Sequence, residues 1–276
     1  MAPIGAEWHY ALLILFIWFS GCTTQEKYDV YPVCPANEDC LTLSTIVNEK
    51  DTYFTSNVTL VFHPGDHSLQ DEIVSVADVS NLTLQGSTAS NSSDALATRI
   101  VCDNSSFSYS SVPFLHIHSV NFVSCRSVLS FTVALFQDCS FENSTGVNGG
   151  AMYVDSVSNV MFVGHTVFTG NTAIQTGGAI YTSDSAITFS GETTFAVNHV
   201  QSGDGGAVYA EEYNTLSFSG YNMFEENTAI YYGLHLPLHP SSVDHNYLEC
   251  SPAMFQIFHS VLQQPINGVE VKMATE

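Results

Sequence analysis

Carboxylates are the side chains of this sequence that occur often enough to suggest acid–base chemistry. The 276 residues include 27 Asp and Glu but only 5 Lys and Arg. A glycoside hydrolase needs two carboxyl groups, about 5–5.5 Å apart for a retaining mechanism or about 6.5–9.5 Å apart for an inverting one. Asp155 and Asp184 follow two similar glycine pairs at nearly equivalent positions, so they would lie on one face of neighbouring structural units. Solvated turn carboxylates are the simpler interpretation, and we predict no catalytic residue.

Sequence motifs for a metal site or for a nucleophile are weaker than the evidence for acid–base chemistry. His116 and His118 are spaced as on one face of a strand, and His235, His239 and His245 lie close together in the sequence. No Cys-x-x-Cys or His-Glu-x-x-His spacing, which is typical of zinc sites, accompanies these histidines. No EF-hand loop and no Gly-x-Ser-x-Gly motif occurs. We therefore expect no metal and no other cofactor.

The charge of the chain restricts its partners. The formal net charge is −22 at pH 7. Nucleic acids and anionic membrane surfaces both select cationic side chains, so we expect neither as a partner. An extracellular glycan or protein ligand is the class of partner that we predict.

The first 22 residues are typical of a secretory signal peptide. An apolar run at positions 11–19 is followed by the small residues Ser20 and Gly21, and the run is too short to span a bilayer. We expect a secreted, extracellular protein with no stable membrane insertion after cleavage. Lipidation of Cys22 and an uncleaved anchor are the alternatives.

Glycosylation and disulfide signals agree with export. Five Asn-x-Ser/Thr sequons occur, at Asn57, Asn81, Asn91, Asn104 and Asn143. Six cysteines remain after residue 22, and Cys34 and Cys40, which bracket a short polar segment, are the pair that we predict to be bonded. Buried free thiols are the alternative for Cys102, Cys125, Cys139 and Cys250.

A composite repeat runs through the middle of the chain. Glycine pairs followed by Ala-x-Tyr recur every 28 residues, at Gly149 and Gly150, Gly177 and Gly178, and Gly205 and Gly206. Between them recurs Phe-x-Gly-x-x-x-Phe-x-x-Asn, with Phe162, Phe168 and Asn171, then Phe189, Phe195 and Asn198, then Phe218, Phe224 and Asn227. A fixed period in this range indicates stacked structural units.

A 28-residue unit restricts the architecture. It can hold three strands of about five residues, and it lacks the helical periodicity that ankyrin-like or tetratricopeptide-like arrays require. A propeller blade would need a fourth strand. We therefore predict an all-β parallel β-helix with about three strands per coil, in which adjacent coils lie about 4.7–4.9 Å apart.

The repeated residues have structural interpretations in such a coil. Both phenylalanines of each unit would point inward and stack on their equivalents in neighbouring coils, while each glycine pair would allow a tight corner. The asparagines would form an amide ladder at a position that tolerates a left-handed conformation.

The flanking segments define the predicted organisation. Residues 23–56 are expected to contain a polar disulfide-closed loop at 27–40 and then a short amphipathic helix that caps the solenoid. Residues 57–235 would form the β-helix, with early strands at 58–62, 73–76, 82–84, 99–102, 114–123 and 128–136. Residues 236–276 would be a C-terminal cap or the beginning of another module.

The pairing of Gly-Gly-Ala-Ile with Phe-x-x-Asn resembles the repeats of the chlamydial polymorphic outer-membrane proteins over about residues 141–233, and the whole chain resembles the pectate-lyase-like superfamily. This resemblance implies a right-handed β-helix, export, and adhesion or surface display. Lyases of that superfamily use Ca²⁺ with an Arg or Lys base, but residues 127–271 contain neither Arg nor Lys.

These observations favour a secreted, non-enzymatic β-helix for adhesion, surface display or recognition of carbohydrate or protein, with exposed Tyr and Asn as contacts. A polysaccharide-degrading hydrolase or lyase of the β-helix superfamily is the first alternative. A structural spacer of the extracellular matrix is the second.

Overall fold

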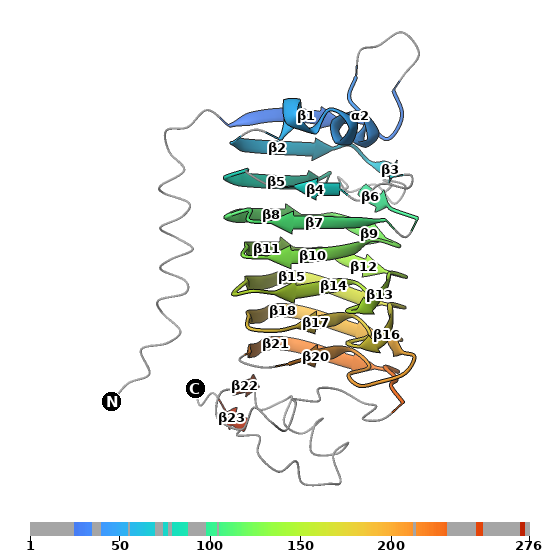
Figure 1. The fold of residues 1–276 in the computed structure, drawn as a ribbon, viewed down its shortest axis with the longest axis vertical. Coiled ribbons are helices and arrows are strands. Elements are labelled where there is room, and N and C mark those ends of the chain that lie inside the picture. Colours follow the sequence, from blue (N-terminus) through green and yellow to red (C-terminus); the bar gives the residue numbers. More distant parts are fainter. Residues whose placement is uncertain are drawn as a thin grey trace, which may run out of the picture.

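The chain winds into a column of parallel strands (Figure 1). The computed structural model describes residues 25–34, 40–54, 56–69, 74–76, 79–87, 98–103, 105–211, 214–230, 247–250 and 271–273. Every strand pairing within these residues joins successive turns of the chain in parallel, as between β15 (Asn159–Thr169) and β18 (Ala186–Ala196). The fold is therefore the predicted all-β parallel β-helix.

Three sheets run along the column. The long sheet contains β1 (Glu26–Val30), β2 (Asn57–Phe62), β3 (Gly65–Ser68), β5 (Asn81–Gly86), β6 (Thr98–Val101), β8 (Phe114–His118), β9 (Asn121–Val123), β11 (Val133–Gln137), β12 (Ser140–Glu142), β15, β18, β21 (Thr215–Glu225), β22 (Tyr247–Cys250) and β23 (Val271–Met273). The six-stranded sheet contains β4 (Val74–Val76), β7 (Ser106–Ser110), β10 (Arg126–Ser130), β14 (Met152–Asp155), β17 (Ile180–Thr182) and β20 (Val208–Ala210). The three-stranded sheet contains β13 (Thr145–Asn148), β16 (Thr172–Thr176) and β19 (His199–Val200).

One clean coil consists of β15, β16 and β17, which confirms about three strands per coil. The register keeps equivalent residues together, because Phe162 pairs with Phe189 and Phe189 pairs with Phe218. Successive coils therefore place the same side chain at the same depth.

The repeated phenylalanines form two continuous stacks inside the column. Phe168 stacks on Phe195 and Phe195 on Phe224, with ring centres 4.8 Å apart in both pairs. Phe162 stacks on Phe189 at 5.0 Å, and the two stacks meet edge to face within each coil. Burial and stacking of these rings stabilise the coil at each level.

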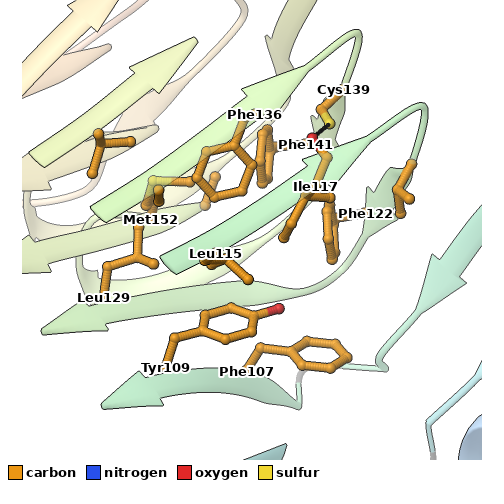
Figure 2. Packing of buried hydrophobic residues seen from close by; sticks show 14 of the residues in the cluster. Phe107, Tyr109, Leu115, Ile117, Phe122, Leu129, Phe136, Cys139, Phe141 and Met152 are labelled. Atoms are coloured by element: carbon orange, nitrogen blue, oxygen red, sulfur yellow. Dashed lines mark hydrogen bonds between the residues drawn. The ribbon is translucent and has the colours of Figure 1, made fainter. Parts of the chain in front are cut away.

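The core continues on the N-terminal side of the clean repeats with other residue types. Figure 2 shows Leu115 and Ile117 of β8, with Phe107 and Tyr109 of β7, pointing into the space between the sheets. All four side chains are at most 4% exposed. The N-terminal coils thus bury a mixed aliphatic and aromatic core in place of uniform stacks.

The repeated asparagines form the predicted amide ladder. Asn171, Asn198 and Asn227 are at most 2% exposed. The Nδ2 of Asn171 donates to Oδ1 of Asn198, and the Nδ2 of Asn198 donates to Oδ1 of Asn227. These two Oδ1 atoms also accept the backbone N–H of the asparagine one coil earlier. The ladder therefore satisfies buried backbone and side-chain groups at one corner.

The left-handed conformation expected at these asparagines lies one residue earlier. Gly170, Val197 and Glu226 have φ of 64°, 56° and 53°, whereas the asparagines themselves do not have positive φ. The chain thus turns at the residue before each asparagine, and the asparagine amide then points inward and reaches the next coil.

The two glycines of each pair serve different purposes. Gly177 has φ of 66°, a conformation that L side chains rarely adopt. Gly178 has no such φ, but a Cβ atom there would collide with the carbonyl oxygen of Gly206 in the next coil. The pair thus combines a left-handed turn with close approach of two backbones.

Two of the expected strands are each divided by a corner. The segment 114–123 forms β8 and β9 because Ser119 turns with φ of 56°, and 128–136 is divided between β10 and β11 at Phe131 with φ of 54°. Hydrophobic runs alone conceal such corners, since the turning residue is not glycine.

The N-terminal segment departs from the predicted loop. Residues 26–30 form β1, which pairs in parallel with β2, so the long sheet begins before residue 57. The expected helix occurs as α2 (Leu43–Asn48) followed by α3 (Lys50–Tyr53). The Oγ1 of Thr42 accepts from the N–H of Thr45 and caps α2, which lies beside β1 at the end of the column (Figure 1).

The long sheet also continues beyond residue 236. β22 pairs in parallel with β21, and β23 pairs with β22, so these two short strands extend the solenoid. The residues of the signal-peptide prediction, 1–22, lie outside the described residues.

Candidate functional site

A shallow groove of about 480 Å³ lies on the outer face of the long sheet, near its N-terminal end. Four neighbouring strands supply most of its lining, because alternate residues of β1, β2, β5 and β8 point away from the core. The lining residues are Gln25, Lys27, Thr59, Thr83, Gln85, His116 and His118.

The register arranges the groove residues in two columns that run along the axis of the solenoid. Lys27 lies beside Thr59, Thr59 beside Thr83, and Thr83 beside His116. Gln85 lies beside His118 in the second column. The groove therefore offers hydroxyl, amide and imidazole groups at the regular spacing of the strands.

Both groove histidines favour the neutral form. Burial lowers the pKa of His116, and the neighbouring His118 lowers it further. Burial also lowers the pKa of His118, while the carboxylate of Asp138 partly opposes that shift. The Nε2 atom of His116 is buried and has no hydrogen-bond partner.

No carboxylate is among the described residues that line this groove, although the chain has 27 of them. Lys27 is its one charged lining residue. A groove without an acid pair lacks the groups that glycoside hydrolysis needs, whereas its hydroxyls and amides suit hydrogen bonding to a polar ligand.

A column of tyrosines occupies the outer face of the six-stranded sheet. Tyr153 stacks on Tyr181 at 4.9 Å between ring centres, and Tyr181 on Tyr209 at 6.0 Å. The guanidinium of Arg126 covers Tyr153 at 5.4 Å and donates to the carbonyl oxygens of Asn148 and Gly149. The rings cover one another, so their faces are not open to a sugar.

The phenols of this column are held neutral. Burial, together with the hydrogen bond that the Tyr181 hydroxyl donates to Glu211, raises the pKa of Tyr181. Burial also raises the pKa of Tyr153 and of Tyr209. Tyr181 and Tyr209 are only 7% and 8% exposed, so these two are not among the exposed tyrosines of the coils, whereas Tyr221 of β21 is 62% exposed.

The register does not place Asp155 and Asp184 in one column. Val154 pairs with Thr182, which places Asp155 beside Ser183. Asp184 has φ of 49° and its carbonyl oxygen accepts from the N–H of Val157, so it lies at a corner one position further along, beside Ser156. The two carboxylates are therefore not at equivalent positions of neighbouring coils, because the corner begins between Asp155 and the position of Asp184.

Two disulfides occur among the described residues. Cys34 is bonded to Cys40 as predicted, and Cys102 is bonded to Cys125 across neighbouring coils. Cys139 is a buried free thiol whose pKa is raised to about 12 by burial. Burial therefore disfavours the thiolate, which is the reactive form of cysteine.

The predicted glycosylation sites differ in accessibility. Asn57 is 9% exposed and its Oδ1 accepts from Nδ2 of Asn81, so Asn57 is poorly placed to carry a glycan. Asn81 is partly exposed and Asn143 is exposed. Asn91 and Asn104 lie outside the described residues.

The sequence did not predict a second polar ladder that the structure contains. The backbone N–H of Thr132 donates to Ser158 Oγ, that of Ser158 to Ser185 Oγ, and that of Ser185 to Asn214 Oδ1. These four residues are at most 5% exposed. What these residues share is a polar side chain two positions before the first buried apolar residue of a long-sheet strand, but the residue type changes from coil to coil.

Residues 165–183 match the repeat of the Chlamydia polymorphic membrane proteins. This stretch runs from the second half of β15 to β17 and includes Phe168, Asn171 and the pair Gly177 and Gly178. No curated protein and no solved structure matches the chain. The similarity thus concerns residues that hold the coils together, and it does not include the groove.

Within the described part of the chain, no helix combines the length and apolar character that a bilayer crossing requires. Across the same residues, no three His, Cys, Asp or Glu side chains converge on a possible metal position.

Proposed function

We propose that this protein is a secreted, non-enzymatic β-helix that recognises an extracellular glycan or protein, in adhesion or surface display, through the groove on the outer face of the long sheet. The observation that carries the proposal is the groove itself, which presents polar side chains from four adjacent, hydrogen-bonded strands of the long sheet. Rigid strands hold such groups in place before binding, which lowers the entropic cost of association.

Two further observations support extracellular recognition. The two disulfides are typical of exported proteins. The match to a repeat of polymorphic membrane proteins is consistent with a surface location. The chemistry of the groove favours neutral or mildly anionic polar ligands, because its single cation stands among hydroxyl, amide and neutral imidazole groups.

Retention of the full chain on an array of glycans and matrix proteins tests this proposal. We expect the double variant Thr83→Ala/Gln85→Ala to lose retention, because both residues line the groove. The matched control is Thr188→Ala/Ser190→Ala, whose positions lie in the same two columns further along the sheet. Equal retention of the two variants on every ligand would refute a role of the groove.

The hydrolase alternative is tested separately by release of reducing ends from a polysaccharide panel. We expect no release by the native chain. Release that is abolished by Asp155→Asn or Asp184→Asn would overturn the non-enzymatic assignment, whatever the array shows.

A further inference from the structure

The two groove histidines have the spacing of a chelating pair. His116 and His118 are separated by one residue on β8, so both side chains lie on the outer face of the long sheet. Their ring centres are 5.4 Å apart and the ring planes are tilted by 37°. Two imidazoles bound to one tetrahedral ion through bonds of about 2.0–2.1 Å hold their ring centres about 5 Å apart.

The state of the imidazoles also suits a metal ligand. Metal binding requires a neutral ring with a free nitrogen lone pair. Burial lowers the pKa of both histidines, so protons compete weakly at neutral pH. His116 Nε2 has no hydrogen-bond partner, and a buried polar atom of this kind calls for a ligand or an ordered water.

The surroundings tolerate a cation. On β5, Thr83 and Gln85 lie beside the two histidines, and on β11 their neighbours are Leu135 and Gln137. The nearest charge acting on the pair is the carboxylate of Asp138, which follows Gln137 and raises the pKa of His118. Lys27 is three strands away from His116, or about 14 Å at the usual strand spacing.

We propose that His116 and His118 together bind one divalent late transition-metal ion, of the Zn²⁺ or Cu²⁺ class, in the groove of the long sheet. Since no third His, Cys, Asp or Glu of the described residues converges there, the site has two protein nitrogens and open positions for water or a ligand oxygen. Imidazole favours Zn²⁺, Cu²⁺ and Ni²⁺, with Cu²⁺ bound most tightly, whereas Ca²⁺ and Mg²⁺ prefer oxygen. This inference does not depend on the proposed adhesion function.

Calorimetric titration of the full chain with CuCl₂ and ZnCl₂ at pH 7.4 tests the site. We expect the native chain to bind one saturable equivalent more than His116→Gln/His118→Gln does. Each single variant should weaken binding by about tenfold or more, because the second imidazole acts at a high effective concentration. His165→Gln is the matched control, since His165 lies on β15 outside the groove and pairs with Glu192 at 3.4 Å.

Electron paramagnetic resonance of the copper-loaded chain supplies a second readout. The native chain should show two imidazole nitrogens on copper, and each single variant should show one. Other histidines of the chain add background sites, so the decisive quantity is the difference in stoichiometry between native chain and double variant. Melting temperature and circular dichroism of the metal-free variants verify that the fold is intact.

Three results would overturn the inference: unchanged stoichiometry in the double variant, an equal loss in His165→Gln, or CaCl₂ binding at the same site. The double variant Thr83→Ala/Gln85→Ala separates this site from the proposed recognition function. It should retain the copper site while losing glycan or protein retention, so either proposal can fail alone.

Discussion

The coils at 57–143 and the coils at 159–230 build the same solenoid by different means. The second region repeats one set of residues, with two phenylalanine stacks and an asparagine ladder. The first region has a mixed core, into which Phe122, Phe136 and Phe141 extend the two stacks. At the corner that the ladder occupies in the second region, the first region has the Cys102–Cys125 disulfide. Ser144 joins the two, because its N–H donates to Asn171 and its hydroxyl donates to the carbonyl oxygen of Cys125.

On the outer face of the long sheet, the first region has the more varied and chemically distinctive side chains. In the two columns that form the groove, the first region presents Thr83, Gln85, His116 and His118, whereas the repeated coils present Met161 and Val163 on β15 and small Thr and Ser side chains on β18 and β21. The repeated coils therefore serve mainly to stabilise the solenoid, whereas the first region carries the amide and imidazole side chains of the groove. Four predictions test this division, beginning with the largest expected effect.

Truncation of a stacked ring should cause the greatest loss of stability. Phe195 lies between Phe168 and Phe224 with no exposed surface, so Phe195→Ala should lower the free energy of unfolding by about 3–5 kcal/mol. Denaturant unfolding measures the change. Tyr221→Ala, at a position that is 62% exposed on the same sheet, is the control and should change stability by less than about 0.5 kcal/mol.

Removal of the disulfide should destabilise the first region selectively. Cys102 and Cys125 are 23 residues apart, and Cys102→Ala/Cys125→Ala should cost about 2–4 kcal/mol. Hydrogen exchange should accelerate in β6 and β9 and remain slow in β15 and β18. Uniform acceleration through both regions would show that the coils unfold as one unit.

Interruption of the amide ladder should cost less than loss of a ring. Asn198→Ala removes the acceptor of the Asn171 N–H and Nδ2 and the donor to the Phe168 carbonyl, which should cost about 1–3 kcal/mol. Thermal unfolding of the native chain and the variant measures this loss of stability. Asn198→Asp keeps the acceptor but directs a buried carboxylate oxygen at the Phe168 carbonyl and at Asn227 Oδ1, so it should be at least as harmful as alanine at neutral pH. A clearly smaller loss for aspartate would contradict the assigned donor bonds.

Mild acid should weaken the first region and have the smallest effect of the four. Burial lowers the pKa values of His67, His116 and His118, so these groups stabilise the fold fully above their unfolded pKa of about 6.5. Their contribution declines as the pH falls below that value toward the lowered folded pKa values. Hydrogen exchange at pH 7.5 and pH 5.0 should show the loss in β3 and β8, and His67→Gln should reduce the loss in β3.

The repeated residues were predictable from sequence because each has a local cause that recurs. Phe162, Phe168 and Asn171 reveal their roles through spacing, since parallel stacking in register places identical residues one above another. The ladder of Thr132, Ser158, Ser185 and Asn214 was missed because any small side chain with an acceptor can fill those positions. The corners at Phe131 and Val157 could not be predicted either, because residues other than glycine adopt φ of 54° and 65° there and leave no pattern in the sequence.

The amino-acid sequence by itself determined the winding of this protein, its period and its buried stacks, since these depend on contacts that recur at one fixed separation along the chain. Only the tertiary structure decided that Asp155 and Asp184 lie in different columns, that the tyrosine faces are covered, and that Gln25 and His118 line one groove. The physical reason is register: a shift of one or two residues at a corner moves a side chain to another column or face, and the corners depend on backbone angles that several residue types can adopt.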